Sequence, residues 1–190
     1  MPLLLETIKI EGKQASNLNY HQARLNKSQK TLFGLDPNID LSALLQAPSD
    51  VLYRCRILYD TEIRSIEYIP YTPKKVHTIK IVRSSLDYSY KYADRSALDT
   101  LLEANNPYDD ILIEKEGLLT DTSIANIAFY DGSQWFTPKY PLLEGTVRAR
   151  LIDEGFLQTK EIRREDISSY TQVALMNAMI GFNIIDARIE

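Results

Sequence analysis

Tyr90-Lys91-Tyr92-Ala93-Asp94-Arg95 opens the stretch of sequence that decides the fold. Thr120-Asp121-Thr122-Ser123-Ile124-Ala125-Asn126 lies in the middle of this stretch, and Glu144-Gly145-Thr146-Val147-Arg148 closes it. Each segment alone is ordinary: a lysine at a predicted helix start, an aspartate after a predicted strand, and a helix that follows a glycine. Their order and spacing carry the information.

Lys91 is the first candidate for chemistry. It lies between a tyrosine-rich, strand-like segment and a predicted helix start, where an ammonium group can be desolvated. An amine that forms an imine must be neutral, and desolvation favours the neutral form. A solvated surface position is the ordinary alternative for any single lysine.

Three further features are candidates for binding an anion or the nitrogen of an aromatic ring. Gly145-Thr146-Val147 opens a predicted helix, and the backbone N–H groups at a helix start favour an anion. Arg24, on a predicted helix near the N-terminus, can bind phosphate oxygens with its planar guanidinium. Asp121, after a predicted strand, can keep a pyridine nitrogen protonated, which makes the ring an electron sink. Each also has a purely structural explanation, as a helix start, a solvated helix position or a turn.

The composition argues against several other classes. The 190 residues carry 22 Lys and Arg against 26 Asp and Glu, and a net charge of −4 gives no sign of a nucleic-acid partner. Cys55 is the single cysteine, so no intrachain disulfide can form and we expect a cytoplasmic protein. No apolar run is long enough for a membrane, and His21 and His77 are not at metal-ligand spacing. We therefore expect neither a membrane partner nor a metal site.

The hydrophobic pattern predicts an α+β protein with two lobes. Residues 1–84 contain predicted strands at 4–10, 51–59, 63–69 and 75–83, with helices at 20–33 and from residue 40. Residues 85–190 mix helices at 94–104 and 145–154 with short strands at 111–114, 124–130, 134–137, 172–176 and 182–189. We place a small α/β lobe at 1–84 and a larger, cofactor-binding lobe at 85–190.

Five groups of residues follow one another along nearly the whole chain. They are Glu6-Thr7-Ile8-Lys9-Ile10 with His21-x-x-Arg24-Leu25-x-x-Ser28 and Phe33-Gly34; Lys91-x-x-x-Arg95; Gly117-Leu118-Leu119-Thr120-Asp121-Thr122-Ser123-x-x-Asn126; Thr137-Pro138 with Leu143-x-Gly145-Thr146-Val147-Arg148; and Val173-x-x-Met176-Asn177-Ala178-Met179-Ile180-Gly181. In this order they resemble the fold-type IV pyridoxal-phosphate enzymes, the class IV aminotransferase-like proteins. The second and the last group are most similar to the aminodeoxychorismate lyase branch.

The resemblance implies a two-lobed fold like that of D-amino-acid aminotransferase, a homodimer, and pyridoxal 5'-phosphate in the cleft between the lobes. Lys91 would bind the cofactor covalently and later move protons at the substrate carbon. Asp121 would face the pyridine nitrogen. The cofactor-binding residues would be Arg24, Lys91, Asp121, Gly145, Thr146, Val147, Asn177 and Ala178.

The function implied by the resemblance is a lyase of folate biosynthesis that converts 4-amino-4-deoxychorismate to 4-aminobenzoate and pyruvate. One alternative is an aminotransferase on a small, branched-chain or D-amino acid, with Arg54 or Arg56 as the clamp for the substrate carboxylate. Ser96 replaces a tyrosine of the branched-chain subgroup and argues against that subgroup. The other alternative is a non-catalytic member, because the family usually has glutamate in place of Asp121 and the chain is short between Pro138 and Gly145.

Overall fold

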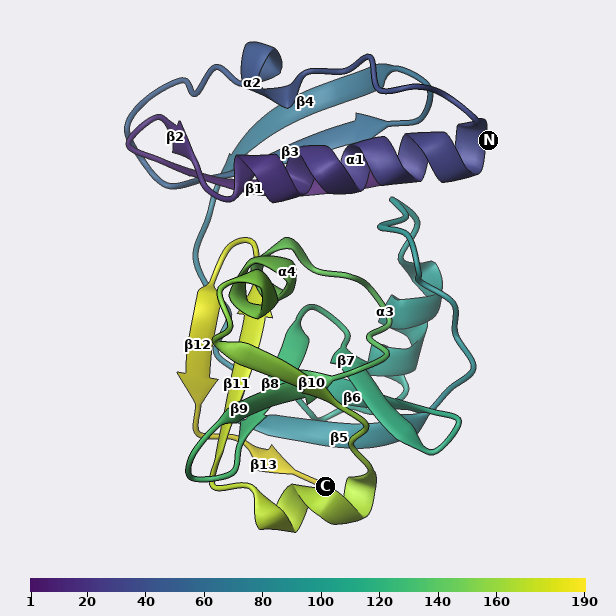
Figure 1. Ribbon diagram of the computed structural model, residues 1–190, viewed down its shortest axis with the longest axis vertical. Coiled ribbons are helices and arrows are strands. Elements are labelled where there is room, and N and C mark those ends of the chain that lie inside the picture. The colour runs from purple at the N-terminus through teal and green to yellow at the C-terminus, as the bar shows by residue number, and fades with distance from the viewer. The chain divides into compact units, whose positions relative to one another are not determined.

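The computed structural model describes residues 1–190, which form two compact units (Figure 1). The first unit contains residues 1–73 and 90–94, and the second contains residues 74–89 and 95–190. These limits differ from the boundary near residue 84 that the sequence suggests. The strand predicted at 75–83 belongs to the second unit, and the short segment around Lys91 belongs to the first.

The first unit is a four-stranded antiparallel sheet with one long helix on it (Figure 1). The strands lie in the order β2-β1-β3-β4, and the helix α1 packs against β1. The elements are β1 (Leu4–Glu11), β2 (Gln14–Ala15), α1 (Leu18–Phe33), α2 (Leu41–Leu44), β3 (Tyr53–Tyr59) and β4 (Ile63–Pro70). The helix ends at Gly34, whose left-handed backbone (φ 68°) lets its N–H bond to the carbonyl of Lys30.

Alternation along the strands separates the two faces of this sheet. Side chains such as Leu4, Ile8 and Ile57 form a core with Leu25 of α1, and all four are fully buried. Glu6 lies on the same face of β1 as Leu4 and Ile8 and is also fully buried. A carboxylate in this position must have polar partners, because an unpaired buried charge is very costly.

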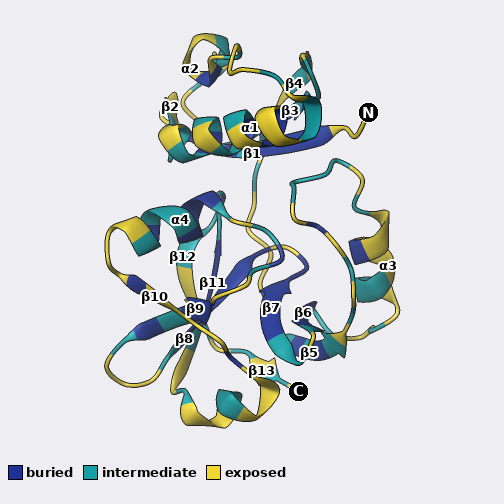
Figure 2. Ribbon diagram, turned by 45° about the vertical axis from the view of Figure 1, so that its right-hand side comes forward, coloured by how far each residue is buried: buried dark blue, intermediate teal, exposed yellow.

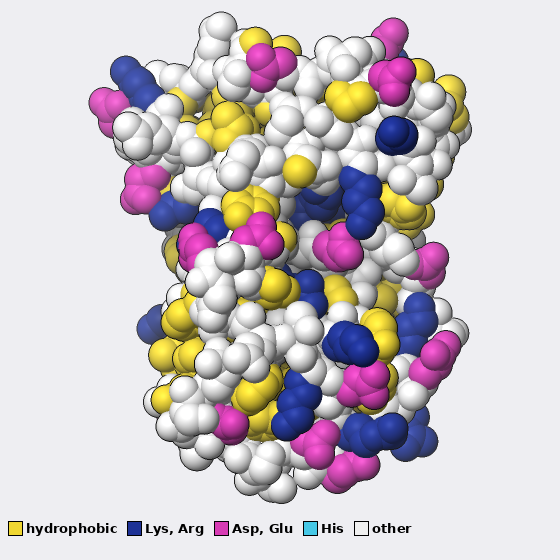
Figure 3. Space-filling view, in the orientation of Figure 1, with side chains coloured by type: hydrophobic (Ala, Val, Ile, Leu, Met, Phe, Trp, Pro, Cys, Tyr) yellow, Lys and Arg dark blue, Asp and Glu magenta, His cyan; other side chains and the backbone are white.

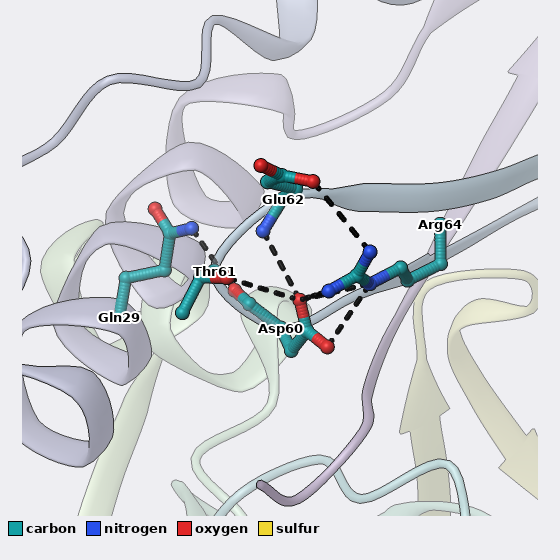
Figure 4. A network of polar contacts seen from close by, with 5 residues as sticks. All are labelled: Gln29, Asp60, Thr61, Glu62 and Arg64. Atoms are coloured by element: carbon teal, nitrogen blue, oxygen red, sulfur yellow. Dashed lines mark hydrogen bonds and ion pairs between the residues drawn. The ribbon is translucent and has the colours of Figure 1, made fainter.

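The turn between β3 and β4 is fastened by one aspartate (Figure 4). The carboxylate of Asp60 accepts from the backbone N–H of Glu62 at 3.1 Å and from Nε of Arg64 at 3.0 Å. Its backbone carbonyl accepts from Nε2 of Gln29 on α1 at 3.1 Å. The hairpin is therefore attached to the helix, which fixes α1 across the sheet.

The second unit has a mixed sheet with strand order β10-β9-β8-β7-β6-β5-β13, and β11 and β12 extend from β8. The pairs β5–β6, β5–β13 and β9–β10 are parallel, whereas the remaining pairs are antiparallel. The elements are β5 (Thr78–Arg83), α3 (Ser96–Glu103), β6 (Asp110–Lys115), β7 (Leu118–Thr122), β8 (Asn126–Tyr130), β9 (Trp135–Pro138), α4 (Thr146–Asp153), β10 (Leu157–Lys160), a 3₁₀ helix (Arg164–Ser169), β11 (Gln172–Asn177), β12 (Gly181–Ile185) and β13 (Arg188–Ile189).

Both faces of this sheet carry a hydrophobic core. Ile127 and Phe129 of β8 belong to a cluster with Leu112, while Ala128, between them, packs with Val147 of α4 on the other face. Buried residues are accordingly concentrated in β6, β7, β8 and β11 (Figure 2). The strand predicted at 182–189 is in fact two strands, since β12 pairs with β11 and β13 with β5.

Charges of both signs are interspersed on the face shown in Figure 3. No helix in the structure combines the length and the apolar character needed to span a bilayer. No group of three or more His, Cys, Asp or Glu side chains is arranged to hold a metal ion.

Candidate active site

Arg24 lies in a buried polar cluster of the first unit. Its Nε donates to Oε1 of Glu6 at 2.8 Å and its Nη2 donates to Oε2 at 2.6 Å, a two-point contact that fixes the guanidinium plane. Nδ1 of His21, one helical turn before Arg24, is 2.6 Å from Oε2 of the same carboxylate. Glu6 and His21 therefore determine where Arg24 lies.

The charge states of this cluster follow from its contacts. Burial alone would raise the pKa of Glu6, but the charge and hydrogen bonds of Arg24, with help from His21, outweigh burial and lower that pKa to about 2. Burial lowers the pKa of His21, although Glu6 opposes that effect. At neutral pH the cluster thus contains a carboxylate, a guanidinium and a neutral imidazole that donates from Nδ1.

Lys91 lies beside β1 in the same unit. The backbone N–H of Leu5 donates to the carbonyl of Lys91 at 2.8 Å, and Leu4 pairs with Tyr92 as an antiparallel bridge. Tyr90 and Tyr92 pack against the core below α1. Pairing therefore gives the Cβ of Lys91 the same direction as that of Leu5. The charge of Lys91 also lowers the pKa of His21, so its ammonium is close enough to act on the cluster of Glu6 and Arg24.

Asp121 is held by neutral donors in the second unit. Nδ2 of Asn126 donates to Oδ1 at 2.8 Å, and the backbone N–H of Leu143 donates to Oδ2 at 2.8 Å. Burial raises the pKa of Asp121 to about 6, because these donors and the charge of Arg148 offset only part of the desolvation. The carboxylate is thus ionised at neutral pH and fixed on both oxygens.

Asn126 also joins Asp121 to the start of α4. Its Nδ2 donates to the carbonyl of Leu143 at 2.8 Å as well as to Asp121. A Cβ atom added to Gly145 would lie only 1.9 Å from Oδ1 of Asn126. The residue before α4 must therefore be glycine as long as Asn126 keeps its place.

The first turn of α4 is buried and contains Thr146, Val147 and Arg148. Nη2 of Arg148 donates to the carbonyl of Pro138 at 2.9 Å, while its Nε is buried without an acceptor. Burial lowers the pKa of Arg148, although the charges of Asp121 and Glu144 oppose that effect. A cation close to the helix start adds to the positive end of the helix dipole.

Asn177 and Ala178 lie at the turn between β11 and β12. Nδ2 of Asn177 donates to the carbonyl of Ile124 at 3.2 Å, and Oδ1 accepts from the backbone N–H groups of Met179 and Ile180 at 2.9 and 3.1 Å. The side chain of Asn177 therefore fastens this turn to the loop that follows Asp121.

The structure groups the predicted residues by unit. Arg24 and Lys91 lie in the first unit, and the second holds Asp121, Gly145, Thr146, Val147, Asn177 and Ala178. Their roles toward a cofactor stay predictions.

Sequence reasoning assigned no role to Asn126, Glu6, His21 or Arg148, which shape both groups. Glu6 had a readable signal, because it is a charged residue on the apolar face of an alternating strand. Asn126 had no such signal beyond its place in the family-like segment, because the residue it contacts, Leu143, lies 17 residues away in the sequence.

These residues fit the chemistry of pyridoxal phosphate. A buried, ionised carboxylate such as Asp121 suits a protonated pyridine nitrogen, because its lone pairs beyond those used by Asn126 and Leu143 can accept another donor. A buried helix start with Thr146 and Val147 suits a phosphate. Arg24 carries a planar, permanently charged guanidinium, the kind of donor group that binds phosphate oxygens.

Several proteins are similar to this chain. Residues 89–187 match the profile of the family described as amino-transferase class IV. An uncharacterized protein of Haemophilus influenzae is 38% identical over 184 residues, covering 94% of this chain and 98% of that protein. The crystal structure of a "putative 4-amino-4-deoxychorismate lyase" from Haemophilus somnus 129pt is 38% identical with a TM-score of 0.82, covering 95% of this chain and 98% of that chain. A "putative amino-acid aminotransferase" from Mesorhizobium loti has a TM-score of 0.85 over 99% of both chains, but its 24% identity shows the fold alone.

Proposed function

Since the chain belongs to the class IV aminotransferase family of pyridoxal-phosphate-dependent enzymes, we propose that it is a lyase converting 4-amino-4-deoxychorismate to 4-aminobenzoate and pyruvate. The observation that carries this proposal is the similarity, over almost the whole of both chains, to the Haemophilus somnus protein described in these terms. The proposal includes a place in folate biosynthesis, a cytoplasmic location and a homodimer.

The proposed roles follow the positions of the residues. When bound, pyridoxal phosphate supplies an electron sink for the carbon next to the substrate nitrogen. Nζ of Lys91 would bind the cofactor and then take the proton from that carbon. Departure of the enolpyruvyl group as pyruvate then leaves an aromatic ring, so the protein needs chiefly a positioned base.

The remaining residues would hold the cofactor. Asp121 would accept a hydrogen bond from the pyridine nitrogen, in an orientation set by Asn126. Arg24 and the backbone at Gly145, Thr146 and Val147 would bind the phosphate. Asn177 and Ala178 would contribute through their backbone, because the Asn177 side chain is already used within its own turn.

A product assay tests the proposal. The purified protein, loaded with pyridoxal phosphate, is given 4-amino-4-deoxychorismate, and pyruvate and 4-aminobenzoate are both quantified. We expect the two products in equal amounts and none from Lys91→Ala. Absence of both products at saturating substrate would reject the lyase. Transfer of the amino group to a 2-oxo acid would instead indicate an aminotransferase.

A further inference from the structure

Arg54 lies on the sheet face of the first unit that faces away from α1. Cross-strand pairing places Lys9 opposite Arg54 and Thr7 opposite Arg56, and both arginines alternate with the buried core residues of β3. The Cβ of Lys91 points to this side, because Lys91 lies beside Leu5 on β1 and alternates with two tyrosines that pack on the core side. Basic side chains of three chain segments therefore share one side of the sheet.

Two of these cations, Lys9 and Arg56, have a carboxylate partner. Nη1 of Arg56 is 3.1 Å from Glu67, its cross-strand neighbour, and Nζ of Lys9 is 2.7 Å from Glu11. Arg54 differs, because its neighbour on β4 is Ile69 and no carboxylate lies within 4.0 Å of its guanidinium. Because β4 places Glu67 opposite Arg56 but Ile69 opposite Arg54, the guanidinium of Arg54 has no carboxylate partner.

One donor atom of the Arg54 guanidinium also lacks an acceptor. Its Nε is buried and makes no hydrogen bond. A donor kept from water without a partner is unfavourable, and a carboxylate that binds the guanidinium would provide the missing acceptor. Tyr71 lies nearby: burial raises the pKa of its phenol, and the charge of Arg54 partly opposes that rise. A phenol hydroxyl next to a guanidinium is a second donor for the same anion.

The spacing between Arg54 and Lys91 suits an elongated substrate. Leu5, beside Lys91, and Lys9, opposite Arg54, are four residues apart on β1, which separates the two positions by about 13 Å along the strand. An anion at Arg54 would then lie at some distance from an amine held at Lys91.

We propose that Arg54 binds a carboxylate of the substrate at the end remote from its amino group. This inference rests on the proposed function in so far as Lys91 marks the amine end. The ligand class is a small amino compound with its carboxylate across a ring or chain from the amine, as in 4-aminobenzoate. Arg56, neutralised by Glu67, does not take this role.

A binding experiment without turnover tests Arg54. The protein loaded with pyridoxal phosphate is titrated calorimetrically with 4-aminobenzoate and with 4-aminobenzamide, which differ in the carboxylate. We expect the carboxylate to bind at least about tenfold more tightly, which corresponds to about 1.4 kcal/mol. Arg54→Gln should abolish this preference, Arg54→Lys should retain part of it, and the matched control Arg56→Gln should keep it.

The outcomes separate this inference from the lyase proposal. An equal affinity of the unaltered protein for both probes, or an unchanged preference in Arg54→Gln, would overturn the role of Arg54 even if pyruvate is produced. If the preference for the carboxylate is lost in Arg54→Gln but kept in Arg56→Gln, the role of Arg54 is supported even if the lyase assay fails. The thermal midpoint and the visible spectrum of the bound cofactor must match those of the unaltered protein, which shows that Arg54→Gln is folded and loaded. If they do not match, Arg54→Lys takes its place: a partial loss of the preference supports the role of Arg54, and an unchanged preference overturns it.

Discussion

Glu6 in the first unit and Asp121 in the second are both buried carboxylates, yet their pKa values move in opposite directions. The pKa of Glu6 falls to about 2 because a guanidinium contacts both of its oxygens, whereas burial raises that of Asp121 to about 6 because its direct donors are neutral. In these two buried sites, two neutral donors and the charge of Arg148 do not offset the burial of Asp121, whereas a guanidinium in direct contact with both oxygens more than offsets the burial of Glu6. Glu6 is built to stay ionised as a support, and Asp121 remains sensitive to whatever cation or proton donor comes next to it.

Arg24→Met should have the largest effect on stability, because it removes the cation that distinguishes Glu6 from Asp121. It leaves the charge of Glu6 buried beside a neutral imidazole, and loss of one partner of a buried ion pair costs about 3–5 kcal/mol of the free energy of unfolding. Chemical denaturation measures this loss. The control is Glu6→Gln with Arg24→Met, which removes both charges and should be clearly more stable than Arg24→Met alone; equal stability would contradict the account.

The pH dependence of stability should show both carboxylates, with opposite sign. Glu6 has a folded pKa of about 2 against an ordinary 4.5, so its contribution of about 3 kcal/mol is present above pH 4.5 and is lost as the pH falls towards 2. Asp121 has a folded pKa of about 6 against an ordinary 3.8, so its contribution of about 3 kcal/mol is present below pH 3.8 and is lost as the pH rises through 6.

Denaturation of the cofactor-free protein at a series of pH values measures these slopes. Glu6→Gln should flatten the curve below pH 4.5, and Asp121→Asn should flatten it between pH 4 and 6. If Asp121→Asn leaves the second slope unchanged, the raised pKa belongs to another group.

Gly145→Ala should disturb Asp121 indirectly, through the side chain of Asn126. The added methyl group would collide with the amide of Asn126, so either α4 or that amide must move, at a cost of up to about 3 kcal/mol. Thermal denaturation measures the stability, and the dissociation constant of pyridoxal phosphate measures the effect on the proposed site. Gly155→Ala is the matched control on the other end of α4, where no atom lies within 4 Å of the added group, although its left-handed backbone carries a strain of its own.

Asn126→Ala should have the smallest effect, about 1–2 kcal/mol, because Asp121 keeps the backbone donor of Leu143. The pKa of Asp121 should rise further, which the pH series above would detect. Gly145→Ala should cost less in the Asn126→Ala background than alone, because the colliding amide is gone. Strict additivity of the two changes would show that they do not act on each other.

Local patterns predicted much of the fold and only part of the site. Alternation predicted β3, and the glycine before Thr146 marked the start of α4, because these signals lie within a few neighbouring residues. The pairing of Leu5 with Lys91 joins segments 86 residues apart, and no local pattern records such a contact. The strand predicted at 75–83 was correct as a strand, but its apolar residues do not say which sheet it joins.

The site residues show the same limit. The family-like segments predicted which side chains to consider, and the family resemblance itself is confirmed. They did not reveal that Glu6 holds Arg24, that Asn126 holds Asp121, or that the Asn177 side chain is occupied by its own turn. Those contacts depend on how the side chains are oriented in the folded chain, so no local sequence pattern predicts them.

The segment 90–94 belongs to the first unit while the chain on either side of it belongs to the second. The polypeptide therefore passes between the units three times, near residues 73, 89 and 94. For anyone dissecting the gene, no single cut yields two complete pieces. A fragment ending at residue 73 lacks Lys91 and leaves the edge of β1 at Leu4 and Leu5 unpaired, and its complement carries Lys91 on a segment with nothing to pair with. Complementation by two fragments expressed together would have to restore that strand pairing before any chemistry at Lys91 could return.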